Sequence, residues 1–259
     1  MSTRYGWPLT TYLSLKVDGN LRLDSANGDT LDLSRVIGDR GVWVAGIADD
    51  VAKRYQLWNF HGVDSVNTTY LDGRWQEALN PTLTTTLEAQ AYRVSEVGRF
   101  KDYLAQQGLN ARYALIGVKG TLAHQPSGIS VALAFNRFGG DRNTVTSFGN
   151  WGGYPEYVSM PYLFAESAAS AIAQSRLARF TALFDLGKIG LTGQSLLFGH
   201  ARIDLNESIF PVGDITVNSL LYRAKLTPQW STRVALESRN AGHSRYDNEF
   251  LTLALKYDF

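Results

Sequence analysis

The sequence contains no cysteine, which excludes disulfide bonds and metal sites built on thiolates. No apolar run approaches the roughly 18–20 residues that a membrane-spanning helix needs. Charged residues make up 19% of the chain, below the ~25% that is usual in soluble domains. The 25 Lys and Arg nearly balance the 24 Asp and Glu, which argues against a nucleic-acid-binding protein that relies on positive charge.

The first residues, MSTRYGWPLTTY, lack the apolar segment of a signal peptide. By itself this start predicts a cytosolic protein, an already processed one, or a chain without its natural N-terminus. The stretch DSANGDTLD (24–32) resembles a calcium loop, but Gly28 and Arg35 break the EF-hand pattern, so we expect a hairpin turn. The four histidines, at 61, 124, 200 and 243, have no metal-ligand spacing, and we expect no metal or cofactor.

Aromatic residues and glycine are plentiful, with 13 Tyr, 12 Phe, 6 Trp and 24 Gly. Many of the apolar residues alternate with polar ones. The last segment is an example: Leu251, Leu253, Leu255, Tyr257 and Phe259 share one parity, and the other parity is mixed and charged. Alternation at period two predicts a strand with two different environments. Both a soluble sandwich and a membrane barrel provide such environments.

The same alternation recurs along most of the chain. It is clean in 111–122, 129–136, 176–186, 219–226 and 231–239, and less clean in 189–203. Further candidate strands are 41–48, 53–60, 65–72 and 82–94, and the weakest are 9–17, 20–26 and 29–37. The chain is therefore predicted to be all-β, with about eleven to fourteen strands if each segment forms one.

The connections between these segments alternate in length. Short ones lie at 125–128, 187–188 and 227–229, and long ones at 95–111, 139–173, 204–213 and 241–247. Barrels of the bacterial outer membrane have short periplasmic turns and long external loops. We therefore predict a transmembrane antiparallel up-and-down β-barrel, a single domain over 1–259, in the outer membrane of a Gram-negative bacterium. Tyr257 and Phe259 are expected in an aromatic girdle that contacts the lipid bilayer.

Several stretches carry a family resemblance. They are YQLWNFHGVDSVNTTYLD (55–72), FGNWGGYPEYVSM (148–160), SRLARFTALFDLGKIGLTGQSLLFGHARID (175–204) and STRVALESRNAGHSRYDNEFLTLALKYDF (231–259). These stretches resemble the OprD-type outer-membrane porins. The resemblance covers residues 41–259 and fits residues 1–40 poorly.

The resemblance implies a passive porin for small hydrophilic solutes and not an enzyme. Porins of this family close a barrel of about eighteen strands, so this chain is either the C-terminal portion of such a barrel or a smaller one. The resemblance also implies that the terminal aromatic, Phe259, is read by the outer-membrane assembly machinery. An arginine track in the pore is associated with the family as well.

Charged residues on the presumed inner faces are the strongest functional feature. The predicted pore-lining residues are Lys119, Arg179, Arg202, Arg223, Lys225, Arg233, Glu237, Arg239 and Lys256. One interpretation is that they are solvated charges that form ion pairs in the lumen. The other is a basic track that guides anions or carboxylates.

The segment 139–173 is long for a loop and is rich in aromatic residues. Phe148, Trp151, Tyr154 and Tyr157 lie within it. We expect it to fold inward and constrict the pore, with an ordinary surface loop as the alternative.

Two other classes of function stay open from the sequence. A barrel enzyme of the phospholipase or omptin type needs a serine or aspartate beside a histidine, and His200 with Ser195 or Asp204 is the best candidate. A soluble β-rich binding protein is the second, and dependence on detergent separates it from a membrane protein.

Overall fold

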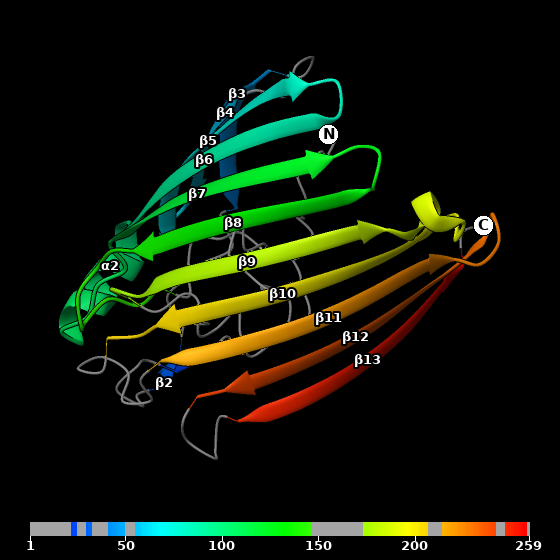
Figure 1. Ribbon diagram of the computed structural model, residues 1–259. Helices are drawn as coiled ribbons and strands as arrows, with labels where there is room; N and C mark the ends of the chain where they lie inside the picture. The colour runs from blue at the N-terminus through cyan, green and yellow to red at the C-terminus, as the bar shows by residue number, and fades with distance from the viewer. Residues whose placement is uncertain are drawn as a thin grey trace.

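The computed structural model describes residues 22–24, 30–32, 41–49, 55–146, 173–206, 214–241 and 247–257. Most of them belong to one sheet of eleven strands in the order β13 to β3, so that every strand pairs with its neighbour in sequence. Figure 1 shows this sheet as a strongly curved wall. The strands are β3 (Val42–Ala48), β4 (Tyr55–Gly62), β5 (Val66–Asn80), β6 (Leu83–Glu96), β7 (Tyr113–His124), β8 (Ile129–Phe138), β9 (Arg176–Asp185), β10 (Gln194–Asp204), β11 (Ile215–Lys225), β12 (Trp230–Asn240) and β13 (Asn248–Tyr257).

All pairings in the sheet are antiparallel, which confirms the predicted up-and-down topology. Within the described part of the chain, β3 and β13 are the two edges, and the sheet is open between them. Two short strands, β1 (Arg22–Asp24) and β2 (Thr30–Asp32), form a separate antiparallel pair. This pairing agrees with the predicted hairpin, although the turn residues 25–29 lie outside the described residues.

The two faces of the sheet differ in exposure because successive side chains point to opposite sides. In β8, Ile129, Val131, Leu133 and Phe135 are exposed, whereas Ala134, Asn136 and Phe138 are buried. Because paired residues on neighbouring strands lie on the same face, the strand pairing assigns a face to every residue from β3 to β13. We call the face with Leu133 the convex face and the face with Phe138 the concave face. Large apolar side chains are exposed on the convex face of every strand, from Trp43 and Ile47 in β3 to Leu251, Leu253 and Leu255 in β13.

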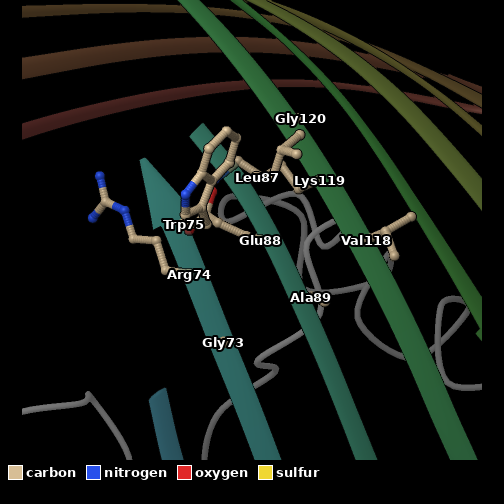
Figure 2. A pocket seen from close by; sticks show the side chains of 9 residues that line it. All are labelled: Gly73, Arg74, Trp75, Leu87, Glu88, Ala89, Val118, Lys119 and Gly120. Carbon is tan, nitrogen blue, oxygen red and sulfur yellow. The ribbon is translucent and has the colours of Figure 1, made fainter. Parts of the chain in front are cut away.

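Small residues leave a shallow groove in the convex face over β5, β6 and β7. Gly73, Ala89 and Gly120 form its floor, and Trp75 and Leu87 rise beside them. In Figure 2, Trp75 lies near Leu87 and Gly120, and Arg74 extends away from them. The lining is mostly apolar, as expected for a surface that contacts hydrocarbon.

The two ends of the sheet carry different connections. At one end, which we call the loop end, strand ends are joined through 97–112, 139–175, 205–214 and 241–247. At the other, the turn end, they are joined through 81–82, 125–128, 186–193 and 226–229. Two details depart from the predicted alternation. The predicted short turn at 187–188 is the longer connection 186–193, which contains the 3-10 helix η1 (Leu186–Ile189). The β4–β5 connection at the loop end is short, at residues 63–65.

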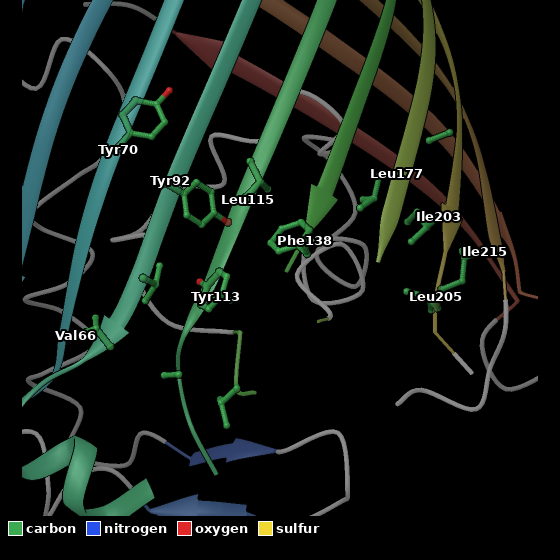
Figure 3. Packing of buried hydrophobic residues seen from close by; sticks show 14 of the residues in the cluster. Val66, Tyr70, Tyr92, Tyr113, Leu115, Phe138, Leu177, Ile203, Leu205 and Ile215 are labelled. Carbon is green, nitrogen blue, oxygen red and sulfur yellow. The ribbon is translucent and has the colours of Figure 1, made fainter. Parts of the chain in front are cut away.

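Apolar side chains fill the concave face near the loop end. Tyr92, Tyr113 and Phe138 form the centre of this cluster, with ring centroids 5.9–6.4 Å apart. Leu177, Ile203 and Ile215 extend it across β9 to β11, as Figure 3 shows. Burial of each large side chain in this cluster stabilises the folded protein by roughly 1.5–3 kcal/mol.

Helix α2 (Gly98–Gln106) lies at the loop end, where Phe100 and Leu104 are fully buried. Two ion pairs hold the connections there: Arg99 Nε is 3.2 Å from Asp64 Oδ2, and Arg112 Nε is 2.7 Å from Glu96 Oε1. The hydrogen bond to Glu96 raises the pKa of the Arg112 guanidinium. No helix of the described chain is long and apolar enough to cross a membrane.

Candidate functional site: the charged concave face

The structure places the predicted pore-lining residues on the concave face, with one exception. The predicted residues that lie on this face are Lys119, Arg179, Arg223, Lys225, Arg233, Glu237, Arg239 and Lys256. Clean alternation in β7, β9, β11 and β12 made this placement predictable. That these side chains line a pore stays a prediction.

Arg202 is the exception, and the prediction of its face was wrong. It pairs in register with Ala178 and Thr216, which belong to the convex face. Its exposed guanidinium forms an ion pair with Asp214. The cause is the apolar concave face near the loop end. There the inward residues Ala201 and Ile203 are fully buried, so the polar residues of β10 point outward, the reverse of the pattern nearer the turn end.

A line of residues paired from strand to strand crosses the concave face from β5 to β12, and five of its members are charged. The row runs Arg74, Glu88, Lys119, Ala134, Arg179, Ala201, Val217 and Arg239. We call its charged members, Arg74, Glu88, Lys119, Arg179 and Arg239, the charged belt. Arg74 was not predicted because the strand at 65–72 was expected to end before it. Glu88 was not predicted because alternation in 82–94 is too weak to assign faces.

The belt combines paired and buried charges. Lys119 Nζ lies 2.8 Å from Glu88 Oε2. Glu237 lies beside the belt on β12, is only 5% exposed, and has one carboxylate oxygen without a hydrogen-bond partner. Acidic groups therefore offset part of the positive field on this face.

A second group of cations lies on β11 to β13 near the turn end. We call Arg223, Lys225, Arg233 and Lys256 the turn-end cations. Arg223 and Arg233 lie directly opposite each other, and Ser231 of β12 lies between Lys225 and Lys256. Like charges directly opposite each other on neighbouring strands are unfavourable.

Two buried amides lie beside the charged belt, toward the loop end. Gln90 is 3% exposed, and neither polar atom of its side chain has a hydrogen-bond partner. Asn136 is fully buried on β8, and Gly117 lies between the two in register. A Cβ atom at Gly117 would be 2.5 Å from Asn136 Oδ1 and 2.8 Å from Gln90 Nε2. The missing side chain at Gly117 therefore leaves room for the two amide groups.

Gly117→Ala should destabilise the folded protein by about 1–3 kcal/mol, because two buried side chains must move to accept the methyl group. Gly120→Ala is the matched control on the same strand, since its Cβ would meet only Leu87 Cδ2 at 3.6 Å. Thermal unfolding in detergent measures both. Equal midpoints for the two variants would contradict the close packing around Gly117.

The aromatic and loop predictions are only partly within the described residues. Tyr257 ends β13 on the convex face and contacts Trp230, with ring centroids 4.8 Å apart. Phe259 and the predicted constriction residues Phe148, Trp151, Tyr154 and Tyr157 lie outside the described residues. Of the segment 139–173, residues 139–146 and 173 are described. The backbone nitrogen of Val145 donates a hydrogen bond to Asn110 O at 2.7 Å. The side chain of Val145 belongs to the buried apolar cluster of the concave face.

The candidate enzyme residues do not meet. Ser195 pairs in register with Arg223 and lies on the concave face, whereas His200 and Asp204 lie on the convex face. His200 Nδ1 is 2.8 Å from Asn218 Oδ1 instead. Within the described residues, no group of three or more His, Cys, Asp or Glu side chains is arranged to hold a metal ion.

Comparison with solved structures gives the architecture a precedent. OprD of Pseudomonas aeruginosa superposes with a TM-score of 0.64 over 92% of this chain, at 14% identity. OccK9 (OpdG) of the same organism gives 0.65 over 89% at 15% identity, and OccAB4 of Acinetobacter baumannii gives 0.67 over 91% at 12% identity. The chain has the OprD-type porin fold. The resemblance seen in the sequence is thus confirmed at the level of fold.

The OprD-type match covers only part of those porins. This chain spans 62% of OprD, 58% of OccK9 and 56% of OccAB4. No protein-family model and no curated protein matches the sequence at a significant level. An open sheet of eleven strands agrees with a match to part of a barrel.

Proposed function

We propose that this protein forms the wall of an outer-membrane channel for small hydrophilic solutes. The observation that supports this most is the contrast between the faces. The convex face exposes apolar side chains on every strand from β3 to β13, and the concave face carries the charged belt and the turn-end cations. Lipid outside and a wet lumen inside account for both faces. The likeness to OprD and the Occ porins supports the same proposal.

The proposed membrane placement puts the turn end on the periplasmic side and the loop end outside the cell. Strands β5 to β13 contain 10–15 residues, and a tilted membrane strand needs about 9–11. The contact between Trp230 and Tyr257 at the turn end fits an interfacial aromatic girdle. Recognition of Phe259 by the assembly machinery is part of the same proposal.

The proposal extends to a preference for anionic or carboxylate-bearing solutes. On the concave face the basic residues are Arg74, Lys119, Arg179, Arg223, Lys225, Arg233, Arg239 and Lys256, and the acidic ones are Asp72, Glu88, Glu96, Asp185 and Glu237. Cations are therefore in excess. Charges in a confined lumen are screened less than charges on an open surface, and arginine binds carboxylates through two parallel hydrogen bonds.

Arg223→Ala/Arg233→Ala should lower the anion-to-cation permeability ratio several-fold, because two facing guanidinium groups are removed from the lumen wall. The measurement is the reversal potential across a salt gradient in planar bilayers, together with the flux of a small carboxylate. Arg202→Ala is the control, since it removes one positive charge from the convex face and none from the concave face.

The outcomes separate two interpretations of these cations. Unchanged ion preference and carboxylate flux in the double variant would mean that Arg223 and Arg233 are solvated charges without influence on selectivity. An equal loss in Arg202→Ala would mean that the effect comes from net charge and not from the lumen wall.

A further inference from the structure

The convex face carries a second set of arginines, at the loop end and away from the proposed lumen. Arg137 of β8 and Arg176 of β9 are directly opposite in register, and both are exposed. Within the described residues, neither guanidinium has a hydrogen-bond or ion-pair partner. Arg93 of β6 lies on the same face two strands away.

Two facing arginines without a counter-charge are unfavourable in a strand pair. Asp204 lies opposite Arg176 on its other side, yet no ion pair joins their side chains. The nearby Arg202 is already paired with Asp214. Within the described residues, no ion pair therefore offsets the charges of Arg137 and Arg176.

A polar cleft of about 500 Å³ lies between these arginines and the loops. Besides Arg137, Arg176 and Asp204, it is lined by Phe138, Gly139, Gly140, Gln174 and Asn206. Hydrogen bonds fix part of the lining: Asn206 Nδ2 donates to Gln174 Oε1 at 2.5 Å, and Gln174 Nε2 donates to Gly140 O at 3.2 Å. The floor of the cleft is therefore held in place without the arginines.

The position of the cleft indicates its ligand. Leu133, Phe135 and Phe180 form the apolar convex surface just toward the turn end. In the proposed membrane placement, on which this inference rests, acyl chains cover those residues and the arginines lie at the level of outer-leaflet headgroups. Charged side chains cost little at that depth, about 0–1 kcal/mol.

We propose that Arg137 and Arg176 bind a phosphate group of a phosphorylated outer-leaflet lipid of the lipid A type. Two guanidinium groups bind one phosphate through several charge-assisted hydrogen bonds. A lipid ligand is favoured over a soluble anion because its acyl chains continue onto the adjoining apolar surface. Arg93 is placed to contact a second phosphate of the same lipid.

The test measures binding of diphosphorylated lipid A to the detergent-solubilised protein by native mass spectrometry. Arg137→Gln/Arg176→Gln should weaken binding about tenfold, and wild-type protein should bind dephosphorylated lipid A as weakly as the double variant binds the diphosphorylated form. The matched control is Lys101→Gln, an exposed cation of α2 at the same end of the sheet.

Equal binding to the double variant and the wild type would overturn the proposal. So would displacement of the lipid by inorganic pyrophosphate at comparable affinity, because the site would then be a soluble-anion site. Planar-bilayer conductance of the wild-type protein separates this proposal from the channel. A conducting wild type without phosphate-dependent lipid binding overturns only the lipid site, and a wild type without conductance overturns the channel.

Discussion

Leu133→Arg should destabilise the folded protein in lipid vesicles by about 2–4 kcal/mol. This is the cost of a cation on the lipid face near the bilayer midplane. Leu133 lies in the middle of β8, points to the convex face and is 67% exposed. In the proposed placement this exposure is to hydrocarbon. Urea titration of the vesicle-inserted protein measures the change.

Ala132→Arg is the control for this substitution. The adjacent residue points to the concave face, where Thr121 and Thr181 are its register partners, so the new guanidinium reaches a polar surface. We expect a much smaller loss for this variant. If both variants lost the same free energy, or if Leu133→Arg folded normally in lipid, the assignment of the convex face to lipid would be wrong.

Phe138→Ala should destabilise the protein by about 3–5 kcal/mol, because truncation of a buried aromatic side chain leaves a cavity. Phe138 is 1% exposed, stacks on Tyr113 and meets the edge of Tyr92. No other side chain of β8 fills this position between the two tyrosines. Thermal unfolding in detergent is the measurement.

Phe135→Ala tests the same chemistry on the opposite face of the same strand. Phe135 is 41% exposed on the convex face. Detergent solvates this position in the folded and the unfolded state, so we expect a loss of about 1 kcal/mol or less. A larger loss for Phe135→Ala than for Phe138→Ala would mean that the buried cluster is not the main source of stability in the sheet.

The sequence determined the fold class and the direction of most side chains, because alternation is a local property of each strand. Leu251, Leu253 and Leu255 alternate with Thr252 and Ala254, and the structure divides them between the two faces as predicted. The same argument placed Arg223 and Arg233 together on the concave face. Where a strand keeps one polar face and one apolar face, its parity can be assigned without tertiary information.

The parity rule failed where the apolar side of a strand changes from one face of the sheet to the other along its length. Near the loop end the concave face is filled by Ala201, Ile203 and Ile215, and this burial reversed the apparent pattern of β10 and sent Arg202 to the convex side. No local signal distinguishes a lipid-facing isoleucine from one buried on the concave face, because both environments are apolar.

The alignment of charges across strands was decided only by the tertiary structure. Arg74, Lys119 and Arg179 become one belt through the registers of five consecutive strands, which no single segment specifies. In the same way, register sets Arg137 opposite Arg176 and places Gly117 between Gln90 and Asn136. The sequence determines which face a residue occupies, and strand register determines its neighbours there, because register depends on turn geometry and on packing across the whole sheet.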